Sequence, residues 1–98
     1  MTRSVSYDDY LIESLKDRRR AEAYLKVALE EEDPRVFLLA LRNVAQACGI
    51  SKVASKSKLN RESLYKMLSK RGNPSLQSLS ALLRSMGFHL TVKSKDAA

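Results

Sequence analysis

Residues that carry most enzyme chemistry are scarce in this chain of 98 residues, which has one cysteine, one histidine and no tryptophan. Cys48 alone cannot form an internal disulfide, which favours a reducing compartment, the cytoplasm. With Cys48 and His89 as the sole thiol and imidazole, neither a nucleophile–base pair nor a metal-ligand spacing occurs. The three glycines form no phosphate-binding loop. We therefore expect no enzyme activity, no catalytic residue, no metal and no cofactor.

Long apolar runs are also missing. No stretch approaches the ~18 residues that a membrane-spanning helix needs. Asp8, Asp9 and Glu13 interrupt the apolar residues near the N-terminus, which argues against a secretory signal. Apolar residues make up 44% and charged residues 30% of the chain, as in ordinary globular proteins. We expect a single domain, residues 1–98, with no membrane association.

Acids are rare in the second part of the chain. Residues 34–98 hold two acids and twelve lysines or arginines, a net charge of +10, whereas residues 1–33 hold nine acids and six cations, a net of −3. A segregated basic region is typical of proteins that bind a polyanion. The alternative is an ordinary solvated basic surface.

Apolar residues recur at three- and four-residue steps through most of the chain, which is the period of amphipathic helices. This pattern predicts helices over Tyr7–Lys16, Arg19–Glu31, Pro34–Cys48, Ser51–Ser57, Arg61–Ser69 and Leu76–Met86. Capping residues mark the starts of four of them: Asp33 before Pro34, a residue near Ser51, Asn60 and Ser75. We expect an all-α fold, a compact bundle of five to six helices, with Leu76, Leu79, Leu82 and Leu83 of the last helix inward.

Strict alternation of apolar and polar residues over Phe88–Lys93 predicts one β-strand. Its apolar face holds Phe88, Leu90 and Val92. A single strand leaves its backbone groups unpaired, and no second strand is evident in the sequence. The simplest partner is the same strand of a second copy, so we expect a homodimer. The domain then divides into N-terminal helices (7–48), a central unit (49–87) and this strand (88–93).

The central unit is predicted to be a helix-turn-helix. Between Ser51 and Pro74 the chain carries seven cations and one acid. Five apolar residues are spaced so that its two short helices can pack together: Val53, Ala54, Leu64, Met67 and Leu68. In a helix-turn-helix, the first helix crosses the DNA backbone and the start of the second helix reaches base edges.

This geometry divides the exposed polar residues into two sets. The candidates for base contacts, at the start and outer face of the second helix, are Asn60, Arg61, Glu62, Ser63, Tyr65 and Lys66. The candidates for phosphate contacts, on the first helix and in the flanking turns, are Ser51, Lys52, Lys56, Lys58, Lys70 and Arg71. Double-stranded DNA is therefore the expected partner. RNA is disfavoured because the aromatic residues of RNA-stacking surfaces are missing.

The segment LNRESLYKMLSKRGNPSLQSLSALLRSMGFHLTV resembles the C-terminal half of addiction-module antidote proteins, and YLKVALEEEDPRVFLLALRNVAQACG resembles their N-terminal half. The resemblance covers roughly residues 7–93. Its most specific parts are RESLYK at Arg61–Lys66 and GNPSL at Gly72–Leu76. These proteins are antitoxins of the Xre-like (lambda repressor-like) helix-turn-helix class, of the host-inhibition-of-growth type.

The resemblance implies a dimeric repressor that binds an inverted repeat in the operator of its own operon and antagonises a small RelE/ParE-like toxin. Arg61, Glu62, Ser63, Tyr65 and Lys66 match the positions of the family's recognition helix. Two positions depart from the family pattern: Lys52 stands where glutamine is frequent, and Lys58 where glycine is usual. A left-handed backbone at Lys58 would cost on the order of 1 kcal/mol relative to glycine.

A second interpretation assigns the function to the acidic half of the chain. Glu30, Glu31, Glu32 and Asp33, together with the acids near the N-terminus, could bind a cationic protein such as a basic toxin. The chain would then be a protein-interaction module with little DNA binding of its own. An ordinary acidic surface is the alternative explanation.

Overall fold

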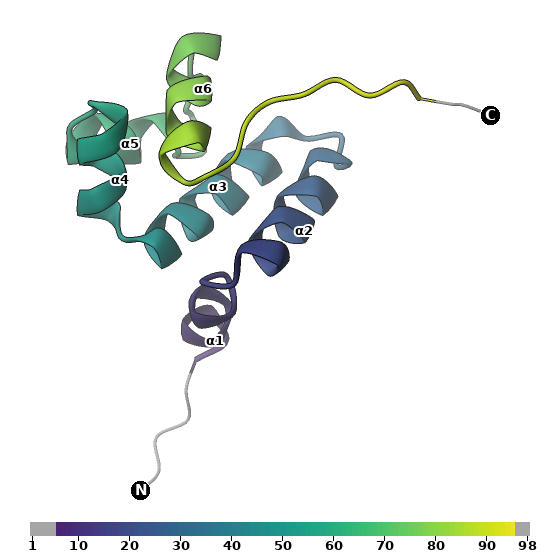
Figure 1. The fold of residues 1–98 in the computed structure, drawn as a ribbon, viewed down its shortest axis with the longest axis horizontal. Helices are drawn as coiled ribbons and strands as arrows, with labels where there is room; N and C mark the ends of the chain where they lie inside the picture. The colour runs from purple at the N-terminus through teal and green to yellow at the C-terminus, as the bar shows by residue number, and fades with distance from the viewer. Residues whose placement is uncertain (1–5, 96–98) are drawn as a thin grey trace, which may run out of the picture.

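Six helices follow one another in the computed structural model, which describes residues 6–95 (Figure 1). They are α1 (Tyr7–Ser14), α2 (Arg18–Leu29), α3 (Pro34–Cys48), α4 (Ile50–Ser57), α5 (Arg61–Met67) and α6 (Leu76–Ser85). Each helix begins and ends within two residues of its predicted range. The all-α prediction is confirmed for the described residues.

Side-chain caps explain where most helices begin. The Asp33 carboxylate accepts a hydrogen bond from the Arg35 backbone N–H at 2.9 Å, with Pro34 at the first helical position. Ser75 Oγ accepts from the Ser78 N–H at 3.0 Å. The predicted cap near Ser51 is wrong, because α4 already begins at Ile50 and has no side-chain cap. The turn at the preceding glycine places Ser51 inside the first helical turn.

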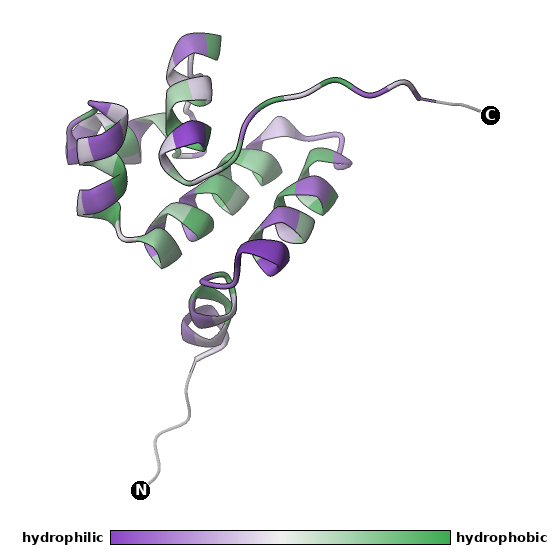
Figure 2. Cartoon of the chain, in the orientation of Figure 1, coloured by the Kyte–Doolittle hydropathy of each residue, from purple (hydrophilic) through white to green (hydrophobic). Residues whose placement is uncertain are grey.

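The core is built around α3. This helix packs against α1, α2 and α4, and α2 runs antiparallel beside it (Figure 1). Leu41, Val44 and Ala45 on its inner face are completely buried. Figure 2 shows hydrophobic residues along much of α3, as expected for a helix enclosed on several sides.

Gly49 turns the chain sharply between α3 and α4, with φ of 101°. The axes of the two helices differ by 105°. This bend directs α4 away from α3, so that α4 packs against α5 and α6 as well. The core continues into this end of the molecule through Val53, Leu64 and Leu82, each at most 1% exposed.

Several apolar side chains lie outside the core. Leu76, predicted to point inward, is 71% exposed at the first position of α6. Tyr7 and Tyr10 in the first turns of α1 are also exposed, whereas Leu15 directly after α1 is buried. A short helix buries only those apolar residues that contact a neighbouring helix. The periodic pattern shows which face is apolar but not how far along the helix that contact extends. Among residues 6–95, no single helix is long and apolar enough to cross a membrane; only α3 and α4 taken together across their bend meet that test.

The predicted strand over Phe88–Lys93 is absent: no residue between 6 and 95 is in a β-strand. The segment is extended and leaves the body of the molecule after α6 (Figure 1). A strand is defined by hydrogen bonds to a neighbouring strand, and the described part of one chain offers none. In a single chain, the alternating pattern therefore produces an extended segment.

Candidate nucleic-acid interface

Two leucines hold α5 against the rest of the molecule. Leu64 is completely buried and Leu68, directly after the helix, is 1% exposed. Met67 is partly buried against the same core. Arg61 at the start of the helix and Glu62, Ser63 and Lys66 on its outer face are all exposed. The predicted division of this helix into an inner and an outer face is confirmed, although the contacts of the outer residues with DNA stay a prediction.

Asn60 fixes the start of α5. Its Oδ1 accepts a hydrogen bond from the Ser63 backbone N–H at 2.7 Å, which confirms the predicted cap. One lone pair of the side-chain carbonyl is thereby used within the protein, while the Nδ2 amide is free to donate outward. Asn60 can therefore contact DNA mainly as a donor.

Tyr65 differs from the other base-contact candidates because it is half-buried. The guanidinium carbon of Arg42, on α3, lies 5.2 Å from the centre of the Tyr65 ring. A guanidinium over an aromatic face at this distance is a cation–π interaction. Tyr65 thus links α5 to α3. No local pattern in the sequence points to this role of Arg42, because its partner lies two helices further along the chain.

All six candidates for phosphate contacts are exposed: Ser51, Lys52, Lys56, Lys58, Lys70 and Arg71. Three ion pairs form among residues 6–95, and none of them includes these cations or those of α5: Glu13–Lys16, Glu22–Lys26 and Asp33–Arg35. The basic residues of α4, α5 and the following turn therefore form no ion pair within the described residues, and Glu62 is the one acid among them. Such a surface has a positive potential that attracts polyanions.

The turn between α4 and α5 has a left-handed residue at Lys58, with φ of 64° and ψ of 30°. The Leu59 N–H donates to the Ala54 carbonyl at 3.0 Å, and the Lys58 N–H donates to the Ser55 carbonyl at 3.3 Å. This pair of bonds is the Schellman motif, in which glycine usually occupies the left-handed position. The turn retains the geometry that glycine would favour, and Lys58 bears the strain.

The turn that ends α5 requires a glycine, because two parts of the backbone lie very close together there. A Cβ atom on Gly72 would lie far inside van der Waals distance of the Met67 carbonyl oxygen. The Gly72 N–H donates to the Ser69 carbonyl at 2.9 Å. Only glycine can therefore occupy this position without moving the backbone. The turn brings Lys70 and Arg71 back beside the end of α5.

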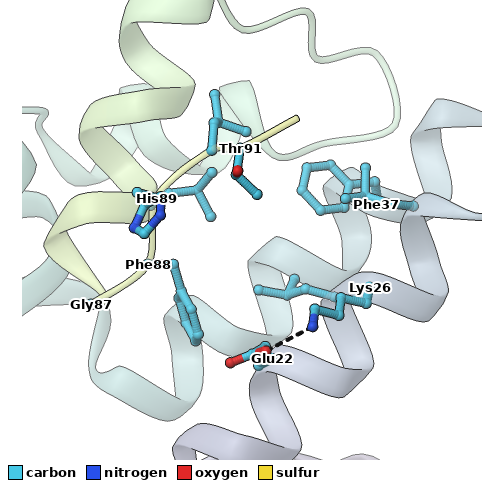
Figure 3. A pocket seen from close by; sticks show the side chains of 11 residues that line it. Glu22, Lys26, Phe37, Gly87, Phe88, His89 and Thr91 are labelled. Carbon is cyan, nitrogen blue, oxygen red and sulfur yellow. Dashed lines mark ion pairs between the residues drawn. The ribbon is translucent and has the colours of Figure 1, made fainter. Parts of the chain in front are cut away.

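The three residues predicted to form the dimer strand have different surroundings. Phe88 packs partly against the core, and its N–H donates to the Leu83 carbonyl at 2.8 Å, which closes the end of α6. Figure 3 shows its ring pointing toward Glu22 of α2, in a cleft of about 350 Å³. Leu90 is 41% and Val92 is 96% exposed. Two of the three residues are thus free to contact another molecule.

The acidic residues at the end of α2 do not act as one group. Asp33 caps α3 and pairs with Arg35 at 2.7 Å, and the hydrogen bonds from Arg35 hold the pKa of the Asp33 carboxyl below its usual value. Glu30, Glu31 and Glu32 are exposed. Beside Glu31, an apolar groove of about 370 Å³ runs between α2 and α3. It includes Val27, which is 61% exposed, and Leu39, which is 39% exposed.

Comparison with known proteins adds information on the family. A family model described as "Probable addiction module antidote protein" matches residues 6–94. A protein of Haemophilus influenzae (strain Rd), named "Uncharacterized protein", is 30% identical over 81 residues, which cover 83% of this chain and 84% of that protein. No solved structure matches the chain. The family match takes in all six helices and most of the extended C-terminal segment.

Proposed function

Since the chain belongs to the family of probable addiction module antidote proteins, we propose that it is a DNA-binding antitoxin that represses its own operon. In this proposal α4 and α5 are a helix-turn-helix of the Xre-like class, with α5 in the major groove. One observation carries the proposal: buried Leu64 and Leu68, the latter directly after the helix, hold α5 against the core, while four polar residues at its start and outer face stay exposed. A helix held by one face and free on the other suits insertion into a groove.

The residues divide by chemistry. The fork of the Arg61 guanidinium matches the two acceptors of guanine, and the Glu62 carboxylate can accept from the amino group of cytosine. Lys52, Lys70 and Arg71 are suited to contact phosphates on either side of the groove and would set the register without reading sequence. Most acids of the chain are in residues 1–33, so their repulsion of the DNA phosphates at α4 and α5 would be weak.

The protein would bind as a homodimer through its extended C-terminal segment. Leu90 and Val92 are exposed, and the alternating sequence suits pairing with the same segment of a second copy. Two recognition helices would then enter successive major grooves ~34 Å apart, on an inverted repeat. With ~6–8 phosphates neutralised, log K should fall with log[salt] at a slope of about −5 to −7.

The test uses Arg61→Ala on DNA from upstream of the gene, with fluorescence anisotropy and footprinting at several salt concentrations. Loss of a bidentate base contact should cost about 1–3 kcal/mol on the operator and little on unrelated DNA. Arg19→Ala, which removes the same charge from the exposed part of α2, serves as control. An unchanged operator footprint with Arg61→Ala would show that α5 has been misassigned.

The second candidate function is neutralisation of a basic RelE/ParE-like toxin. The groove between α2 and α3, with exposed Val27 and Leu39 beside Glu31, favours it because an apolar patch edged by acids suits a cationic partner. Both functions can coexist in one chain. Co-expression with the product of the neighbouring gene separates them: Leu39→Lys should abolish co-purification of that product and leave operator binding intact. If Leu39→Lys retains the product fully, the groove is not its docking surface.

A further inference from the structure

A second basic feature lies between the start of α2, the end of α3, α4 and the end of α6. A pocket of about 290 Å³ is lined by four cations: Arg18 at the start of α2, Lys52 and Lys56 on α4, and Arg84 near the end of α6. No acidic residue is among the residues that line it. Lys52 and Lys56 also belong to the predicted phosphate-contact set, but Arg18 and Arg84 come from outside the helix-turn-helix segment. Residues distant in the sequence thus form one cationic site.

The backbone around the pocket positions Arg18. The guanidinium of Arg18 lies against Gly87, where a Cβ atom would be 3.0 Å from Nη2 and 3.1 Å from Cζ. Gly87 has φ of 91°, a conformation that favours glycine, and its N–H donates to the Arg84 carbonyl at 3.0 Å. The turn that ends α6 therefore makes room for the Arg18 side chain, and Arg84 lines the same pocket.

The charges of the pocket are unbalanced. None of the four cations takes part in the ion pairs formed among residues 6–95. Lys52 and Lys56 are four residues apart on one helix, a spacing at which like charges repel. Such an arrangement is stabilised when an anion occupies the space between the charges.

Cys48, which also lines the pocket, does not supply that anion. Burial raises the pKa of its thiol, while Lys52, Arg18 and Lys56 act in the opposite direction. The raised pKa keeps the thiol protonated and neutral near pH 7.

We propose that this pocket binds a phosphate group. Arginine forks match the oxygens of phosphate in pairs, and lysines add point charges without a demand for planarity. In the DNA complex the ligand would be a backbone phosphate beside the one contacted at the start of α4; this part rests on the proposed function. In the absence of DNA, a free phosphate compound offers the same chemistry.

The experiment compares Arg18→Gln and Arg84→Gln with Arg20→Gln, a control that removes one charge from the same helix as Arg18. Arg20 is exposed and lies roughly 200° around α2 from Arg18. Each pocket variant should weaken binding to all DNA sequences by about 5–10-fold and make the salt slope shallower by about 1, whereas the control should change both less. If one arginine variant does not fold, the other carries the DNA test, and Lys56→Gln is compared only with the free probe, because Lys56 is also a predicted phosphate contact of the helix-turn-helix.

Inorganic pyrophosphate serves as the free probe, with the melting temperature of the full-length protein as readout. A saturable rise of about 4 °C or more in the wild type, absent in both pocket variants, would support the pocket with a free phosphate compound as its ligand. A loss confined to DNA binding would support a backbone phosphate. The proposal is overturned if the pocket variants match the control in both measurements. If the wild type binds no DNA at all, the proposed function fails, and the pyrophosphate result alone decides on the pocket.

Discussion

Asn60 illustrates how one side chain can be needed for both folding and recognition. Its carbonyl oxygen caps α5 at 2.7 Å from the Ser63 nitrogen, and its amide is exposed at the start of the helix proposed to read DNA. Substitution by alanine would remove both functions at once. A substitution that keeps the cap and changes the outward group is needed to separate them.

Asn60→Asp provides this separation. Aspartate is as good a cap as asparagine and favours the positive end of the helix, so the free energy of unfolding should change little. Its negative charge should nevertheless weaken operator binding strongly. Asn60→Ala should lower the free energy of unfolding by about 1 kcal/mol. Urea denaturation and anisotropy measure the two effects. Unchanged operator binding by Asn60→Asp would contradict a DNA-facing position.

At the residue scale, the sequence predicted roles that depend on local spacing and missed those that depend on contacts across the fold. The Asn60 cap and the buried Leu64 follow from neighbours within four positions. The stacking of Arg42 on Tyr65 joins helices that are not adjacent in the chain. The same is true of the convergence of Arg18 and Arg84 on one pocket. Neither the Arg42–Tyr65 contact nor the shared pocket produces a periodic pattern in the sequence, because each depends on how the helices are oriented in space.

Among the structural elements, the turn between α4 and α5 carries a measurable strain. Lys58 occupies the left-handed position of a Schellman motif that glycine fills at no steric cost. The motif is set by its two hydrogen bonds and by the partly buried Leu59, which packs against the core. The geometry is therefore maintained by residues other than Lys58.

Lys58→Gly should consequently raise the free energy of unfolding by about 0.5–1 kcal/mol. It should also make the salt slope of DNA binding shallower by about 1 if Lys58 contacts a phosphate. Lys56→Gly, two positions earlier within α4, is the matched control and should destabilise by about 1 kcal/mol. Chemical denaturation measures the change in the free energy of unfolding for both variants. A loss of stability with Lys58→Gly would mean that the lysine side chain contributes more than the strain costs.

Helix positions could be predicted well from the sequence because capping residues and apolar spacing agree for most of them. Asp33 with Pro34, Asn60 and Ser75 all cap where expected. The predicted cap near Ser51 is wrong because α4 begins directly after Gly49, whose unusual backbone conformation has no capping side chain to mark it. The predicted strand over Phe88–Lys93 is wrong for the described residues of one chain, because alternation indicates an extended chain and pairing requires a partner that the pattern does not supply.

At the scale of the whole molecule, the extended C-terminal segment is the feature best placed to join two copies. Phe88 packs against the core and closes α6, so a truncation that removes it would damage the fold. Leu90 and Val92 lie beyond it and are exposed. Assembly can therefore be tested without loss of the monomer's core.

A chain ending at His89 should be monomeric in sedimentation equilibrium at micromolar concentration, with nearly unchanged melting temperature and much weaker operator binding. The removed part also carries Lys93 and Lys95, so a full-length Lys93→Gln, Lys95→Gln variant is the charge control and should remain dimeric. A full-length wild-type chain that sediments as a monomer at this concentration would refute the proposed pairing.

The shortness of α5 has a consequence for how long the protein persists in a cell. A helix of seven residues is not stable outside a folded protein. The free energy needed to form its first turn exceeds the stabilisation from the few hydrogen bonds that follow. Its shape exists only while Leu64 and Leu68 stay docked. In the proposed complex with DNA, any opening of this end of the molecule would therefore release the DNA and offer an unfolded segment to proteases in the same event, so that loss of the proposed repression and degradation of the protein would start together.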